Sequence, residues 1–296
     1  MTSQLVELLR SLRLAQWIKN TLVFAPLVLG GRLDEPPAVA ATALAFVALG
    51  LAASATYLVN DILDAPNDRQ HWSKRDRPIA RGSLSPRVAA IAAAALFAGG
   101  FGLAAMVSLK AFGALLIYVV LSLAYSVALK RVPILDALLL AILFTMRLGL
   151  GAVAANVPPS PWLFVFSMFV FTSLSFTKRY AELRRSAEHS GSPVGGRGYR
   201  IEDQPLLVGL GVAAGVGSVI ILILYIIEDA YKQSFYGSSS WLWGFPLIVF
   251  LLVSRLWLVT LRGEMNDDPV AFVLTDRISL ALLVLLLVCF YIAWAA

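Results

Sequence analysis

Residues 57–82 read YLVNDILDAPNDRQHWSKRDRPIARG and follow a long run of Ala, Leu and Val. That run is apolar enough to lie in lipid, and a membrane-spanning helix needs about 20 such residues. The quoted stretch then turns polar, with carboxylates first and cations after them. This order predicts a membrane-spanning helix that carries a polar site at its end.

The composition of the whole chain supports a membrane protein. Of its 296 residues, 59% are hydrophobic and 14% are charged, against roughly 25% charged in ordinary soluble domains. A water-soluble domain of this size cannot hide so much apolar surface. We therefore expect an all-α polytopic membrane protein that forms one catalytic domain over residues 1–296. The nine expected spans are 14–31, 37–59, 88–108, 111–129, 133–155, 161–177, 205–227, 241–260 and 278–295. The first contains Lys19 and Asn20, so a helix that lies partly in the membrane interface is the alternative there.

The distribution of charge predicts the orientation. Most of the 24 Lys and Arg residues lie in the N-terminus and in loops 60–87, 130–132, 178–204 and 261–277. Because basic residues concentrate on the cytoplasmic side, we expect the N-terminus and these loops on the cytoplasmic side of the cell membrane and the C-terminus on its outer side. The net charge of +6 therefore needs no nucleic acid to explain it. The lone Cys289 excludes an intrachain disulfide and a thiolate metal site.

The carboxylates of the quoted stretch form the first candidate site. Asn60, Asp64 and Asp68 are spaced four apart and Asp61 comes three before Asp64, so on a helix these side chains gather on one face. Crowded carboxylates repel one another near a low-dielectric boundary, and a divalent cation relieves this repulsion. Oxygen ligands without His or Cys favour Mg²⁺. Pro66 interrupts helical hydrogen bonding, so the sequence leaves open whether Asp68 reaches the metal.

The basic residues that follow form the second candidate site. Lys74 and Arg77 lie where fixed cations could neutralise phosphate oxygens that a metal leaves uncovered. Together with the carboxylates they predict a diphosphate-binding site. Arg69, Arg81 and Arg87 are instead attributed to the positive-inside bias.

The polar stretch resembles the NDxxDxxxD…KxxRP signature of the UbiA superfamily of intramembrane prenyltransferases. Four further segments are similar to the decaprenyl-phosphate phosphoribosyltransferase branch, although Leu14 replaces its usual proline. The resemblance covers essentially the whole chain and implies a UbiA-like bundle with a lipid-accessible cavity that opens to the cytoplasm. These segments are RLAQWIKNTLVFAPL (13–27), YSVALKRVPILD (125–136), FTKRYAELRR (176–185) and DDPVAFVLTDR (267–277).

The resemblance also implies a reaction. Loop 178–204 lacks the second DxxxD motif of members that transfer prenyl groups, which favours the phosphoribosyl branch. The implied reaction is Mg²⁺-dependent transfer of 5-phosphoribose from phosphoribosyl pyrophosphate to a polyprenyl phosphate. Asn60, Asp61 and Asp64 would be catalytic, and together with Asp68 they would hold the metal. The implied substrate-binding residues are Lys19, Lys74, Arg77, Tyr125, Arg147, Lys178 and Arg179. Arg13 and Asn20 are weaker candidates for phosphate binding.

Several of these residues also have a structural interpretation. Lys19 could reach the membrane interface without binding substrate, and Tyr125 could be an interfacial aromatic residue. Arg147 lies within an expected span, where it could meet the lipid phosphate or pair with a carboxylate such as Asp136. The sequence does not separate packing from substrate contact for Tyr180 and Glu182, and it leaves open whether the chain forms a homo-oligomer.

Three other functions were weighed. A prenyltransferase with an aromatic acceptor keeps the fold, but the missing DxxxD counts against it. A transporter would place its ionisable residues near the bilayer midplane, whereas here they gather in loops. An inactive scaffold is disfavoured because the NDxxD and KxxRP residues are present.

Overall fold

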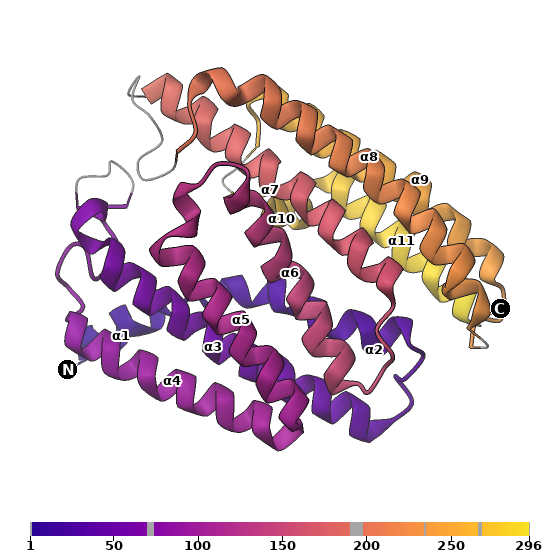
Figure 1. The fold of residues 1–296 in the computed structure, drawn as a ribbon, viewed down its shortest axis with the longest axis horizontal. Coiled ribbons are helices and arrows are strands. Elements are labelled where there is room, and N and C mark those ends of the chain that lie inside the picture. Colours follow the sequence, from indigo (N-terminus) through magenta and orange to yellow (C-terminus); the bar gives the residue numbers. More distant parts are fainter. Residues whose placement is uncertain (1, 70–73, 190–197, 234, 266–267, 296) are drawn as a thin grey trace. The chain divides into compact units, whose positions relative to one another are not determined.

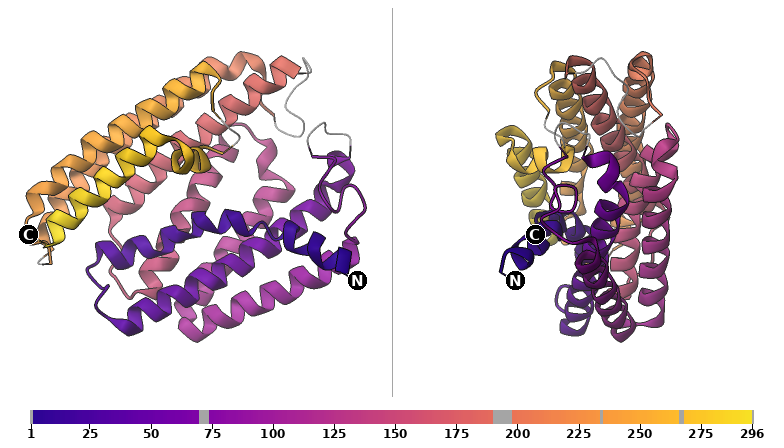
Figure 2. Two further views of the ribbon diagram at one scale, coloured as in Figure 1. Left: turned by 180° about the vertical axis from the view of Figure 1, so that it is seen from behind. Right: turned by 90° about the vertical axis from the view of Figure 1, so that its left-hand side faces the viewer.

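A computed structural model describes residues 2–69, 74–189, 198–233, 235–265 and 268–295 of the chain (Figure 1). Every regular element in these ranges is a helix. The helices form two compact units (Figure 2), one of Met1–Leu129 with Met146–Pro158 and one of Lys130–Thr145 with Pro159–Ala296. Helix α6 (Leu135–Ala154) contributes residues to both units. The prediction of one catalytic domain is not tested by this division.

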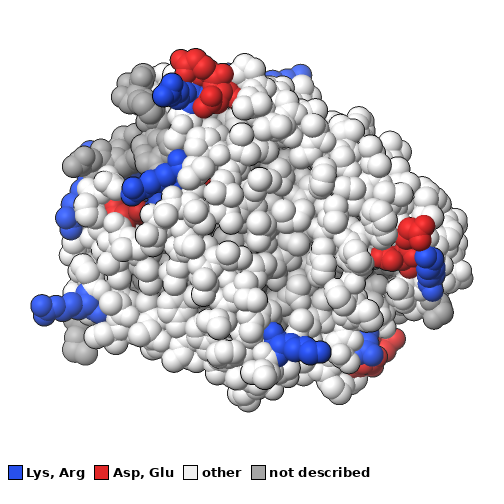
Figure 3. Space-filling view, in the orientation of Figure 1, with Lys and Arg blue, Asp and Glu red and all other residues white. Residues whose placement is uncertain are grey.

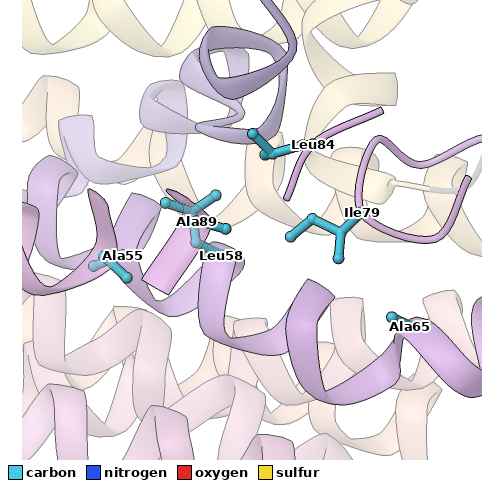
Figure 4. Packing of buried hydrophobic residues seen from close by; sticks show 7 residues of the cluster. Ala55, Leu58, Ala65, Ile79, Leu84 and Ala89 are labelled. Atoms are coloured by element: carbon cyan, nitrogen blue, oxygen red, sulfur yellow. The ribbon is translucent and has the colours of Figure 1, made fainter. Parts of the chain in front are cut away.

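The first unit is built around a pair of long antiparallel helices. α3 and α4 pack through small side chains, and Gly100 lies so close that a Cβ there would be 2.8 Å from the carbonyl oxygen of Ala48. A cluster that includes Leu58 and Leu84 fills the polar end of this pair (Figure 4). Small residues let helix backbones approach closely in membrane proteins. The helices of this unit besides α6 are α1 (Thr2–Ser11), η1 (Leu14–Phe24), α2 (Ala25–Leu29), α3 (Pro36–Asp68), α4 (Pro86–Val107), α5 (Leu109–Val127) and η2 (Leu129–Arg131), the last of which ends just past the boundary of the unit.

The first expected span, 14–31, differs from the prediction. It forms the 3₁₀ helix η1 followed by the short α2, and not one α-helix. A 3₁₀ helix rises about 2 Å per residue, so the segment still extends far along α3. It runs antiparallel to α3, because Trp17 bonds Ser54 whereas Leu27 packs with Ala38.

Tight packing accompanies this unusual conformation. A Cβ on Gly50 would be 2.7 Å from the indole of Trp17, and one on Gly151 would be 2.0 Å from the carbonyl oxygen of Val23. The segment therefore lies directly against α3 on one side and α6 on another. Such neighbours are distant in sequence, which is why hydropathy alone predicted an ordinary span.

In the second unit, too, every described regular element is a helix. α7 and α8 pack side by side, with Ser173 donating to the carbonyl of Gly211 and Trp257 donating to Ser173 from α9. Its remaining elements are α7 (Pro161–His189), η3 (Ile201–Asp203), α8 (Gln204–Glu228), η4 (Ala230–Lys232), η5 (Ser239–Trp243), α9 (Gly244–Arg262), α10 (Pro269–Thr275) and α11 (Arg277–Ala295).

Eight described helices are long and apolar enough to cross a membrane, which confirms eight of the nine expected spans. Most of the surface in the space-filling view is uncharged, and the acidic and basic side chains form a few small groups on it (Figure 3). Two helices are longer than the spans predicted from hydropathy: α3 continues to Asp68 and α7 to His189. Each extension carries residues that the sequence predicted to be functional.

Candidate active site

The carboxylates lie on the last turns of α3, which continues through Pro66 to Asp68. Asp61 is 3% exposed and Asp68 4%, while Asp64 is half-buried. A buried carboxylate is costly unless it is paired and hydrogen-bonded. The structure therefore has to supply cations for Asp61 and Asp68.

Two arginines supply them. Arg13 Nη2 lies 2.6 Å from Asp61 Oδ1, and its guanidinium also lies over the ring of Tyr57. Arg77 Nη1 reaches both Asp61 Oδ1 at 3.2 Å and Asp68 Oδ2 at 2.7 Å. The KxxRP arginine thus lies against two carboxylates of the NDxxDxxxD stretch, Asp61 and Asp68.

Arg13 reaches the carboxylate from a break in the chain. It has φ 51° and ψ 47°, a left-handed conformation that is uncommon for a residue other than glycine. This residue separates α1 from η1 and turns the chain toward α3. The resemblance had implied Arg13 only as a weaker candidate for phosphate binding, and its pairing with Asp61 was not predicted.

The oxygen atoms near Asp61 suit a hard cation. Asn60 Oδ1 is buried, and the described residues offer it no hydrogen-bond donor. Such an orphaned acceptor calls for a ligand, a water or an ion. Among the described residues, no group of three or more His, Cys, Asp or Glu side chains has the arrangement of a metal site. The oxygen atoms of Asn60, Asp61 and Asp64 suit Mg²⁺ by their chemistry. In this structure Arg77 pairs with the carboxylates of Asp61 and Asp68.

The basic loop after α3 is only partly described, because residues 70–73 lie outside the described ranges. Lys74 is half-buried. Arg77 faces the carboxylates, whereas Arg81 binds Glu7 of α1 at 2.8 Å. Arg81 therefore has a specific partner that the positive-inside interpretation did not foresee.

A second polar cluster lies inside the first unit. Arg147 Nε donates to Asn20 Oδ1 at 3.1 Å, and its Nη2 donates to the hydroxyl of Tyr118 at 3.1 Å. All three side chains are buried, and Asn20 Nδ2 has no acceptor among the described residues. The cluster ties η1 to α5 and α6. Lys19, next to Asn20, is half-buried.

Tyr125 is half-buried near the end of α5, also within the first unit. Its neighbour Ser126 donates to the carbonyl of Ser122 within the same helix. The substrate role of Tyr125 stays a prediction.

The remaining predicted residues belong to the second unit. Arg179 is 1% exposed, with its Nε 2.6 Å from Asp136 Oδ2 and its Nη1 2.6 Å from Glu182 Oε2. Asp136, suggested as a partner of Arg147, is thus engaged by Arg179. Lys178 and Tyr180 are half-buried beside it on α7.

Tyr199 completes this ion pair and was missed by sequence analysis. Its hydroxyl donates to Asp136 Oδ1 and accepts from the backbone N–H of Ile134. Burial, and then the bond to Asp136, raise the pKa of Tyr199 far above its ordinary value. Gly198 allows this approach, since a Cβ there would lie 2.7 Å from the carbonyl oxygen of Arg131. No local sequence signal distinguishes this tyrosine, because its partners are more than 60 residues away.

The fold and the site together define the class of this protein. It is a membrane-embedded helical protein with a carboxylate–arginine site at the end of a long helix. Residues 21–275 match the model of the UbiA prenyltransferase family. The chain belongs to the UbiA prenyltransferase family, as the NDxxD and KxxRP residues predicted.

Relatives span several bacterial groups. The chain is 39% identical to an uncharacterized protein of Sinorhizobium fredii over 92% of its own length but only 52% of that relative. It is 32% identical to the nodulation protein NoeC of Azorhizobium caulinodans, covering 89% of this chain and 85% of that one. It is 31% identical to the decaprenyl-phosphate phosphoribosyltransferase of Mycobacterium tuberculosis, covering 91% and 88%.

Solved structures support the fold. A UbiA homologue from Archaeoglobus fulgidus, bound to DMAPP and Mg²⁺, superposes with a TM-score of 0.73 over 98% of both chains at 14% identity. This likeness confirms the expected UbiA-like helical architecture.

Proposed function

We propose that this protein transfers 5-phosphoribose from phosphoribosyl pyrophosphate to a polyprenyl phosphate. The observation that carries the proposal is the set of oxygen donors on Asn60, Asp61 and Asp64 beside Arg13 and Arg77. The similarity to the mycobacterial phosphoribosyltransferase over nine-tenths of the chain supports the choice of donor. The absence of a DxxxD motif in 178–204 supports it further.

In this reaction an oxygen of the lipid phosphate bonds to C1 of the ribose while the bond from C1 to the pyrophosphate oxygen breaks. Pyrophosphate leaves with the electron pair of that bond. The attacking phosphate is already anionic, so the protein needs no strong base. Catalysis then depends on positioning and on stabilising charge at the departing pyrophosphate.

Asn60, Asp61 and Asp64 would hold Mg²⁺, with Asp68 as a further candidate. When bound, the metal supplies Lewis-acid stabilisation of the pyrophosphate. Arg77 and Lys74 would bind phosphate oxygens, and Arg13 would fix the carboxylate of Asp61. Lys19, Tyr125, Arg147, Lys178 and Arg179 remain proposed substrate contacts, although the buried partners of Arg147 and Arg179 also suit a supporting role.

We further propose a location in the cell membrane with the N-terminus and the polar loops in the cytoplasm. Lys and Arg are concentrated in these segments, and such a bias sets membrane orientation. Labelling of an introduced cysteine at exposed Arg75 from each side of sealed vesicles tests it. Labelling from the outside of right-side-out vesicles would reverse the proposed orientation.

The reaction is tested with purified protein, Mg²⁺, decaprenyl phosphate and phosphoribosyl pyrophosphate labelled in the ribose. We expect label to enter the organic phase, and Asp61→Asn and Asp64→Asn to lower the rate by about 10²–10³-fold, the range seen when a charge-stabilising group is removed. Chelation with EDTA should abolish transfer, and added Mg²⁺ should restore it. Asp76→Asn, a change at an exposed aspartate in the loop that follows α3, is the matched control and should keep full activity.

The alternative is a prenyltransferase that moves a prenyl group from its diphosphate to an aromatic acceptor. Prenylation of such an acceptor, with no transfer of labelled ribose to any polyprenyl phosphate, would replace the first proposal. The fold and the carboxylate–arginine site would be unaffected.

A further inference from the structure

Helix α1 (Thr2–Ser11) is packed against the protein on one face and exposes apolar side chains on the other. On its inner face Glu7 and Ser11 are buried, and Leu8, followed by Leu12 just beyond the helix, packs against the buried cluster at the polar end of α3 and α4. On its outer face Leu5 is 59% exposed and Leu9 is 51% exposed, with Val6 beside them. The inner face is explained by packing within the first unit. The outer face is not.

The position of α1 along the spans identifies its surroundings. The cluster that it covers includes Leu58 and Ala65, near the end of α3, and Ala89 and Ala93, in the first turns of α4. Both helices are candidate membrane spans. α1 therefore lies at the level where two spans begin or end, which is the boundary between lipid and water.

Exposed apolar side chains also follow α1 along the chain. Leu14 and Ile18 of η1 are exposed as well, and η1 runs beside the spanning part of α3. Arg10 is exposed on the same short helix. Exposed leucines next to a basic residue are characteristic of helices that lie in the headgroup region, where the aliphatic residues enter the acyl boundary and the cation stays among the phosphates.

The buried edge of α1 is connected to the candidate active site. Glu7 Oε1 binds Arg81 Nη2 at 2.8 Å and Arg10 Nη1 at 3.1 Å. Arg81 belongs to the loop that carries Lys74 and Arg77. Through Glu7, the orientation of α1 is thus linked to the loop that faces the carboxylates of α3.

We propose that α1 is a membrane-surface helix. The face formed by Leu5, Val6 and Leu9 inserts at the boundary between headgroups and acyl chains. Because Glu7 binds Arg81, this insertion also positions the basic loop. The partner is the lipid bilayer. The positioning half of this inference rests on the proposed function, since it assigns the loop a role in binding the donor; the docking half does not.

The docking is tested with single nitroxide labels at Leu5 and Leu9 in a Cys289→Ala background, in vesicles of phosphatidylcholine and phosphatidylglycerol. We expect both labels to be accessible to oxygen and protected from a water-soluble nickel complex. A label at exposed Arg75 is the matched water-facing control. Nickel access at Leu5 and Leu9 equal to that at Arg75 would overturn the proposal.

The coupling is tested by Glu7→Gln, with Arg10→Gln as the matched control because it removes the other partner of Glu7 and leaves the loop contact intact. We expect Glu7→Gln to raise the KM for phosphoribosyl pyrophosphate by about two- to fivefold, as suits a partly exposed ion pair, with kcat unchanged. Arg10→Gln should change neither constant. An unchanged KM in Glu7→Gln would contradict the proposed coupling between α1 and the basic loop.

A readout that needs no activity separates this inference from the proposed function. A nitroxide at Arg75 should become more mobile in Glu7→Gln and not in Arg10→Gln. If transfer of phosphoribose is never observed, the accessibility of Leu5 and Leu9 and the mobility at Arg75 still decide the inference. Equal mobility in all three proteins would contradict the link between α1 and the loop.

Discussion

The guanidinium of Arg179 and the carboxylate of Asp136 form an ion pair at 2.6 Å in which both side chains are almost completely buried. Glu182 and Tyr199 bind the same pair from two sides. Arg179 lies within a motif that suggested substrate binding, yet its charge is already compensated inside the protein. This arrangement favours a role in holding α7 to the segment that contains Asp136.

The first prediction concerns this pair. Arg179→Gln and Asp136→Asn should each destabilise the protein by about 3–5 kcal/mol, because each leaves a buried charge without its partner. The double variant should lose much less unfolding free energy than the sum of the two single losses. Thermal unfolding in detergent measures all three. Strictly additive losses would show that the two side chains do not depend on each other.

The second prediction tests the close approach of α6 to η1. Gly151→Ala should destabilise by about 1–3 kcal/mol, because its methyl group would collide with the backbone of Val23. Gly149→Ala, two residues earlier on the same helix, meets nothing within 4 Å and should be neutral or stabilising by about 0.5–1 kcal/mol. Thermal unfolding of the two variants is compared side by side. Equal effects would contradict the described packing of η1.

The third prediction concerns the intramembrane arginine. Asn20→Leu removes the acceptor of Arg147 Nε and should cost about 1.5–3 kcal/mol, as for a hydrogen bond to a charged group. Tyr118→Phe keeps the ring under the guanidinium and removes only the hydroxyl, so it should cost less. Unfolding temperatures in detergent provide the measurement. A larger loss of stability for Tyr118→Phe than for Asn20→Leu would mean that Tyr118 is the more important partner of Arg147.

The fourth prediction concerns acid stability of the second unit. Arg255 binds both oxygens of Asp276 at 2.7 Å and, by this hydrogen bonding, lowers the pKa of Asp276 well below its ordinary value. Because the folded pKa is the lower one, the stabilisation is complete above the unfolded value of about 4 and is lost as pH falls below it.

Unfolding of the native protein and of Arg255→Gln should therefore be compared from neutral pH down to about pH 3. The difference between their unfolding temperatures should shrink as Asp276 approaches protonation. Ser279, which donates to Asp276 through its backbone N–H and its hydroxyl, is unchanged in both proteins. A difference that stays constant with pH would mean that Asp276 is not the group responsible.

Local sequence patterns predicted much of the helical fold and part of the candidate site. Eight spans followed from hydropathy because an apolar stretch of sufficient length has to satisfy its own backbone hydrogen bonds in lipid, which a helix does. The grouping of Asp61 and Asp64 followed from helical spacing, and Arg77 from the KxxRP resemblance. These predictions used residues close in sequence or a motif, so they needed no knowledge of packing.

Tertiary structure decided the rest. Residues 14–31 were expected to form a span, but residues 14–24 form a 3₁₀ helix packed against Gly50 and Gly151. Arg147 bonds Asn20 across 127 positions of sequence, and Tyr199 reaches Asp136 across 63. The sequence by itself determined where charge enters this apolar protein. Which charges compensate one another was decided only by packing, because a buried ionic group takes the partner that folding brings within hydrogen-bonding distance.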